Sequence, residues 1–81
     1  MMPAQIAEVF AFVMADDAGN EGIAAMIVGH TVMPLVGADQ ARVDSLWPYA
    51  RALAEAQRRP VTLIRFRERY KVITYDPGNP R

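Results

Sequence analysis

The sequence predicts a small α+β domain: an antiparallel sheet with one helix packed on one face. Three observations support this fold class. Short apolar runs separated by turn-forming residues fill the first half, a stripe with helical spacing follows, and a β-rich segment comes after a proline. A chain of 81 residues is of a length typical of one small domain, which we place at 1–81. We expect residues 76–81 to form a frayed tail.

The apolar runs at residues 6–14, 23–28 and 32–36 are typical of strands, because they are rich in Val, Ile and Phe and are bounded by glycine. Residues 16–22 read Asp-Asp-Ala-Gly-Asn-Glu-Gly, which is a strong turn signal. Pro34 cannot donate a hydrogen bond to a ladder, so we expect the third strand to lie at a sheet edge or a bulge.

From Asp39 onward the apolar spacing becomes helical. Asp39 is the predicted N-cap, and Pro60 ends the helix. We expect Arg58 and Arg59 in the last turn and one helix, kinked near Pro48, rather than two. The stripe expected to face the sheet contains Val43, Leu46, Trp47, Ala50, Leu53, Ala54 and Gln57.

After Pro60 the chain is predicted to form a fourth strand, giving the order β-β-β-α-β. Residues 61–66 are β-rich, and the strand is expected to continue, or to turn back as a hairpin, as far as residue 75. Ile64 and Phe66 share one face and are expected to pack under the helix. The opposite face then carries a row of cations: Arg65, Arg67, Arg69 and Lys71.

Both faces of the first two strands are apolar, although a single helix can cover only one of them. A large uncovered apolar patch is typical of an interaction surface. The sequence therefore predicts a homodimer, a complex with another protein, or both. The residues predicted to form the dimer face are Val9, Ala11, Val13, Ala24, Met26 and Val28.

The charges cancel overall but are separated along the chain. Residues 1–40 contain five acidic and no basic residues, whereas all nine basic residues follow, against four acidic ones. This separation suggests an acidic and a basic patch. The candidate partner-binding residues are the acidic hairpin residues Asp16, Asp17 and Glu21 and the cations Arg65, Arg67, Arg69 and Lys71.

No motif predicts catalysis, a metal or a cofactor. The chain lacks cysteine, which excludes disulfides, thiolate zinc sites and cysteine nucleophiles. His30 lies in a predicted turn, and Ser45 lacks a nucleophile elbow. A calcium loop that begins at Asp16 or Asp17 would place Ile27 or Val28 where glutamate is required. We therefore expect no enzyme activity and no small-molecule substrate.

No targeting or membrane-spanning segment is predicted. Glu8 interrupts the first apolar run, and the longest stretch without a charged side chain, residues 22–38, is shorter than a span and is broken by Gly29 and Pro34. We expect a cytoplasmic protein that does not bind membranes.

These observations predict a small non-enzymatic protein-interaction module that binds a macromolecular partner, as a homodimer. Phage-encoded inhibitors and small regulators share its size and composition, which is an analogy without a motif. The acidic hairpin could mimic phosphates, or the cationic strand could bind an acidic surface. The alternative is a nucleic-acid-binding protein that uses residues 65–71, where cations alternate with Phe66 and Tyr70. Two features weigh against it: the net charge is zero, and the cations and the aromatic residues lie on opposite faces of the predicted strand.

Overall fold

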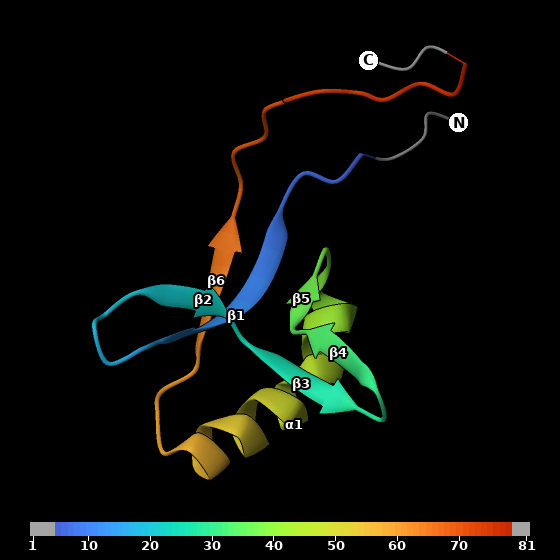
Figure 1. The fold of residues 1–81 in the computed structure, drawn as a ribbon. Helices are drawn as coiled ribbons and strands as arrows, with labels where there is room; N and C mark the ends of the chain where they lie inside the picture. The colour runs from blue at the N-terminus through green and yellow to red at the C-terminus, as the bar shows by residue number, and fades with distance from the viewer. Residues whose placement is uncertain (1–4, 79–81) are drawn as a thin grey trace.

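The computed structural model describes residues 5–78 and has the predicted α+β class, with small antiparallel sheets and one helix (Figure 1). Each of the second and third predicted strands is split into two short ones. Of the predicted tail at 76–81, residues 79–81 lie outside the described part. The elements are β1 (Val9–Ala15), β2 (Glu21–Ile23), β3 (Ala25–Val28), β4 (Thr31–Pro34), β5 (Val36–Gly37), α1 (Gln40–Gln57) and β6 (Thr62–Phe66).

Strand β1 is the centre of the main sheet. Strand β6 pairs with one edge of β1, from Val9 opposite Phe66 to Val13 opposite Thr62. The other edge is shared by β2, beside residues 13–15, and β5, beside residues 10–11. Strands β3 and β4 form a separate hairpin, so all pairs are antiparallel.

The chain bends where β2 meets β3 and where β4 meets β5. A triangle of backbone hydrogen bonds joins these two points to β1. Phe12 N donates to Leu35 O at 3.0 Å, Leu35 N donates to Ala24 O at 2.8 Å, and Ala24 N donates to Phe12 O at 2.7 Å. Because all three side chains are buried in the same core, the hairpin is held against the main sheet at its base.

Helix α1 begins as predicted and continues through Pro48 as one helix. The Asp39 side chain accepts a hydrogen bond from Arg42 N at 2.8 Å, which makes Asp39 the N-cap. The prediction that Arg58 and Arg59 lie in the last turn is wrong. Arg58 has the left-handed conformation, with φ of 55°, and its N–H bonds to Ala54 O, so the helix ends before it.

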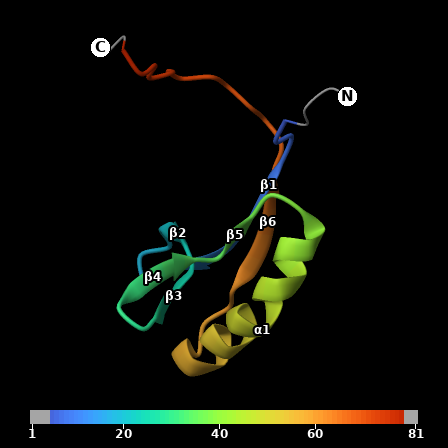
Figure 2. The ribbon, with the colours of Figure 1, turned by 90° about the vertical axis from the view of Figure 1, so that its right-hand side faces the viewer.

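The core lies between the main sheet, the β3–β4 hairpin and α1 (Figure 2). The Phe12 and Trp47 rings meet at a centroid distance of 5.7 Å. The largest fully buried side chains are Phe12, Leu35 and Leu46, and three alanines belong to the buried set. Such a small core provides little stability for an 81-residue chain. Within residues 5–78, no helix is both long and apolar enough to cross a membrane.

Candidate interaction surface

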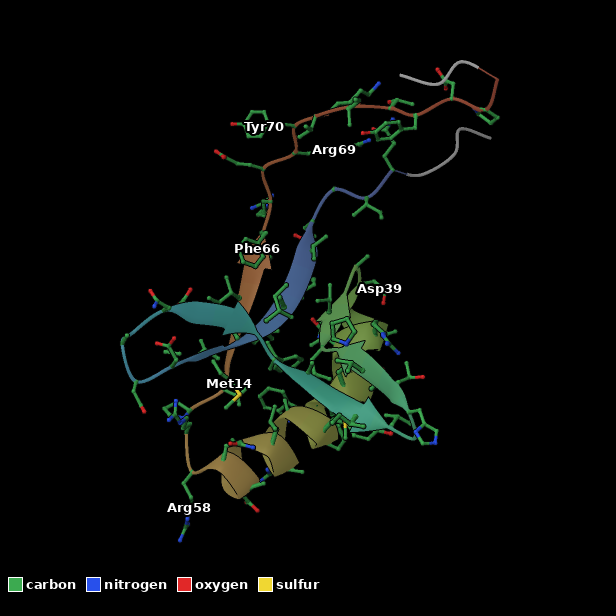
Figure 3. The ribbon with its side chains drawn as sticks, viewed as in Figure 1. Met14, Asp39, Arg58, Phe66, Arg69 and Tyr70 are labelled. Carbon is green, nitrogen blue, oxygen red and sulfur yellow. The ribbon has the colours of Figure 1, made fainter. Side chains whose placement is uncertain are left out.

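The side of the strands that faces away from α1 is almost entirely apolar. Phe10, Phe12 and Met14 point toward the core, and Figure 3 shows Met14 between β1 and the helix. Because side chains alternate along a strand, Val9, Ala11 and Val13 face the other way. Their partners across the ladders extend this face over β6, β2 and β5.

The β3–β4 hairpin continues the same face. Met26 and Met33 are opposite each other and pack against the core, so the adjacent pair Ile27 and Val32 faces outward. Ile27 is 73% exposed and Val32 is 63% exposed. We call the whole surface the outer sheet face: Val9, Ala11, Val13, Ile23, Ala25, Ile27, Val32, Pro34, Val36, Thr62, Ile64 and Phe66. Thr62 is the one polar member of this set.

Three of the six residues predicted for the dimer face point to the side of the outer sheet face, namely Val9, Ala11 and Val13. Of these, Ala11 is 1% and Val13 7% exposed, so only Val9 offers accessible surface there. The placement of the other three is corrected by the structure. Ala24 is 5% exposed within the core, and Met26 packs against it. Val28 is exposed near the tip of the β3–β4 hairpin, but it lies on the Met26 side of the hairpin and not on the outer sheet face.

The second correction concerns β6. Ile64 and Phe66 were predicted to pack under the helix, but Ile64 is opposite Ala11 and Phe66 is opposite Val9. Both therefore belong to the outer sheet face, and Phe66 is 51% exposed. The outer residues of β4 and β5 were missed as well. Val32, Pro34 and Val36 alternate with the inward Met33 and Leu35, and this alternation was the signal that could have identified them.

The predicted cationic row is exposed, but the structure does not make it a continuous strand. Only Arg65 lies within β6, while Arg67, Arg69 and Lys71 follow it in extended chain. The Glu8 carboxylate lies 4.0 Å from Arg65 Nε and 3.9 Å from Arg67 Nε. Arg69 donates to Gln5 Oε1 at 2.7 Å. Glu8 of the N-terminal segment thus partly compensates the positive charge of the predicted cationic row.

The predicted acidic residues gather in the β1–β2 hairpin, where two of them have structural partners. Asp16 Oδ1 accepts hydrogen bonds from Ala18 N and Asn20 N, both at 2.9 Å. The bond from Asn20 is the main reason that the pKa of Asp16 is lowered. Asp17 accepts a bond from Arg59 Nη2 at 2.6 Å, which ties the hairpin to the chain beyond α1. The Arg59 guanidinium therefore compensates the charge of Asp17, whereas Asp16 remains ionised.

The residues considered for catalysis are not brought together. His30 lies in the exposed turn between β3 and β4, and Ser45 Oγ donates to Arg42 O at 2.7 Å within α1. Among the residues that the structure describes, no three His, Asp or Glu side chains are grouped as metal ligands.

The chain exposes far more surface than a compact monomer of its mass. Its accessible area is 6992 Å² at 9.0 kDa, whereas the scaling for folded monomers gives about 4,900 Å². Its radius of gyration is 15.8 Å, against about 12 Å for a compact domain of this length.

The fold and this surface define a small α+β domain with one apolar sheet face that its helix does not cover. No family model, curated protein or solved structure matches the chain.

Proposed function

We propose that this protein is a small non-enzymatic protein-interaction module that works as a homodimer and binds an apolar surface of a partner protein through its outer sheet face. The observation that supports the proposal most directly is the exposure of large apolar side chains on that face, with Ile23 57%, Ile27 73% and Phe66 51% exposed. Solvent contact with such large apolar side chains is unfavourable, and association removes it.

The small core supports the homodimer. A chain that buries few large side chains gains stability when a second copy adds to the buried apolar area. A standard interface buries about 800 Å² per partner, and the excess exposed area of this chain over a compact monomer is about 2,000 Å². A regulator or inhibitor that acts by occupying another protein would need no catalytic group, and a cytoplasmic location remains part of the proposal.

The test combines molar mass with the binding of an apolar dye. Light scattering should give twice the mass of the chain, and the dimer should still bind the dye. The double variant Ile23→Asp/Ile27→Asp should bind several-fold less dye, because both side chains belong to the outer sheet face. The matched control is Val28→Asp/Tyr49→Asp, which changes side chains that are 52% and 44% exposed but lie on the Met26 side of the hairpin and on α1. A monomer that binds no dye would overturn the proposal, as would equal dye binding by the two double variants.

The nucleic-acid alternative is tested with the same protein preparation. The protein is titrated with a labelled single-stranded oligonucleotide at several salt concentrations. We expect no salt-sensitive affinity, because Glu8 lies beside Arg65 and Arg67. Salt-sensitive binding that is lost in Arg65→Glu/Arg67→Glu/Arg69→Glu would replace the protein-interaction proposal with the nucleic-acid one.

A further inference from the structure

The segment from residue 62 to residue 74 is symmetric in chemical class about Glu68. Residues at equal distances on either side of Glu68 belong to the same class. The pairs are Arg67 and Arg69, Phe66 and Tyr70, Arg65 and Lys71, Ile64 and Val72, Leu63 and Ile73, and Thr62 and Thr74. An antiparallel pairing of this segment with itself would therefore place like next to like.

The two halves of the segment have different structures. The first half is β6, which pairs with β1 along one edge. Its other edge has no strand partner within residues 5–78. The second half, residues 67–75, is extended and projects from the body beyond β6 (Figure 1); we call it the arm. One chain thus carries both an open strand edge and an extended segment without a strand partner in the described range.

The arm exposes apolar side chains that a solvated tail would not require. Tyr70 is 78% exposed and projects away from the body (Figure 3). Val72 is 91%, Ile73 56% and Tyr75 71% exposed. An extended segment of this composition is suited to add as a strand to a sheet edge, where main-chain hydrogen bonds provide affinity and alternate side chains provide specificity.

The symmetry does not arise from a hairpin within one chain. Such a hairpin would need a three-residue loop at Arg67, Glu68 and Arg69, and loops of that length normally place glycine in the left-handed region. None of the three residues has a positive φ in the structure. The chain continues past Glu68 without turning back along β6 (Figures 1 and 2).

We propose that two copies of this chain associate about a twofold axis at Glu68, with the arm of each copy pairing antiparallel with β6 of the other. This inference rests on the proposed function and specifies how its homodimer forms. In this register Ile64 is opposite Val72 of the second copy, Phe66 is opposite Tyr70, and Leu63 is opposite Ile73. Registers shifted by two residues place Phe66 opposite Glu68, or Arg65 opposite Ile73. Such registers pair an apolar residue with a charged one.

This pairing has two structural consequences. It covers both open β6 edges, which would otherwise remain available for aggregation. It also joins the outer sheet faces of the two copies side by side, because Ile64 and Phe66 lie on that face and their facing residues in the arm would continue it. The surface available to a partner protein is then larger than in one chain.

The pairing also brings like charges together, which gives it a measurable signature. Arg65 is opposite Lys71 of the second copy and Arg67 is opposite Arg69, and like charges across a ladder repel. Glu8 beside Arg65 and Arg67 offsets part of this repulsion. Added salt screens the repulsion. The dimer dissociation constant should therefore fall several-fold between low and high salt.

A single cysteine at Glu68 tests the register directly, because the chain has no cysteine of its own. On the axis residue 68 faces itself, with Cα atoms about 5 Å apart, which suits a disulfide. The matched controls are Arg67→Cys and Arg69→Cys. In these variants the two copies of the introduced cysteine would be separated by about 8 Å, beyond the disulfide range. All three side chains are exposed, so the variants should fold.

Under mild oxidation Glu68→Cys should form a covalent dimer at least several-fold faster than either control. Equal rates for the three variants would overturn the inference. If light scattering still shows a dimer in that case, the proposed function stands and only this mode of association fails. If the wild-type chain is a monomer, the homodimer of the proposed function fails before the cross-linking is measured.

Discussion

The backbone amide of Phe12 donates to the carbonyl of Leu35 at 3.0 Å, and both side chains are buried in the same core. This contact joins β1 to the point where β4 and β5 meet, so it fixes the angle at which the hairpin leaves the sheet. The outer sheet face depends on that angle, because it extends over both parts. The stability of the core and the shape of the candidate interaction surface are therefore linked.

Replacing Leu35 by alanine should lower the free energy of unfolding by about 2–5 kcal/mol, because it removes a fully buried side chain and leaves a cavity. Urea denaturation at one fixed protein concentration measures the change. The control Val32→Ala alters a 63% exposed residue of the same hairpin and should change stability by less than about 0.5 kcal/mol. Equal losses for the two variants would show that Leu35 does not anchor the core.

Gly37→Ala should destabilise the protein by about 1–3 kcal/mol, as overpacking of a close contact does. A Cβ at position 37 would lie 2.5 Å from Arg42 Cγ and 2.9 Å from Arg42 Cβ. The Arg42 Cβ is fixed to the helix backbone, so it cannot move away as the end of a flexible side chain could. The control is Gly22→Ala, where nothing lies within 4 Å of the added Cβ. Thermal denaturation that ranks the control as the less stable variant would contradict this account.

Asp39→Ala should lower stability by about 1 kcal/mol, because Arg42 N loses its side-chain acceptor at the start of α1. Asp39→Asn retains an oxygen acceptor and should lose much less. Circular dichroism during urea denaturation compares the two variants. A loss of the same size in both would mean that the charge of Asp39, rather than its capping bond, matters at this position.

The sequence was informative where local chemistry determines structure. The N-cap at Asp39 and the burial of Val43, Leu46 and Ala50 follow from nearest-neighbour preferences and a period of 3.6, which a single chain displays directly. The common direction of Val9, Ala11 and Val13 was also predictable, since alternation alone places them on one face of β1, but the burial of Ala11 and Val13 was not predicted.

The sequence was uninformative where structure depends on contacts between distant residues. Whether Ile64 or Leu63 faces the helix depends on the register between β6 and β1, and a slip of one residue exchanges the faces. The burial of Ala24 likewise depends on the hydrogen bond from its N–H to Phe12 O, and no local sequence pattern specifies this bond. Among the missed residues of the candidate surface, Ile64 and Phe66 depend on such a distant pairing, whereas the local alternation of Val32, Pro34 and Val36 with Met33 and Leu35 was available in the sequence.

Asp16 should make the stability of the β1–β2 hairpin depend on pH. Its carboxylate accepts bonds from Asn20 N and Ala18 N, and the Asn20 bond is the main cause of its lowered pKa. The folded state therefore binds the proton less readily than the unfolded state, whose aspartate pKa is about 3.9. The contribution is fully present above that value and is lost as the pH falls through the lower pKa of the folded state.

Asp16→Asn removes the titrating group but keeps a side-chain oxygen. Urea midpoints of the wild type and this variant should differ by a constant amount above about pH 5, and the difference should shrink toward acid. The matched variant Asp44→Asn, at an exposed carboxylate that accepts a bond from Gln40 Nε2 at 2.9 Å, tests whether removing any carboxylate has the same effect. A difference between the wild type and Asp16→Asn that stays constant down to about pH 2 would show that the hairpin bonds are not coupled to folding.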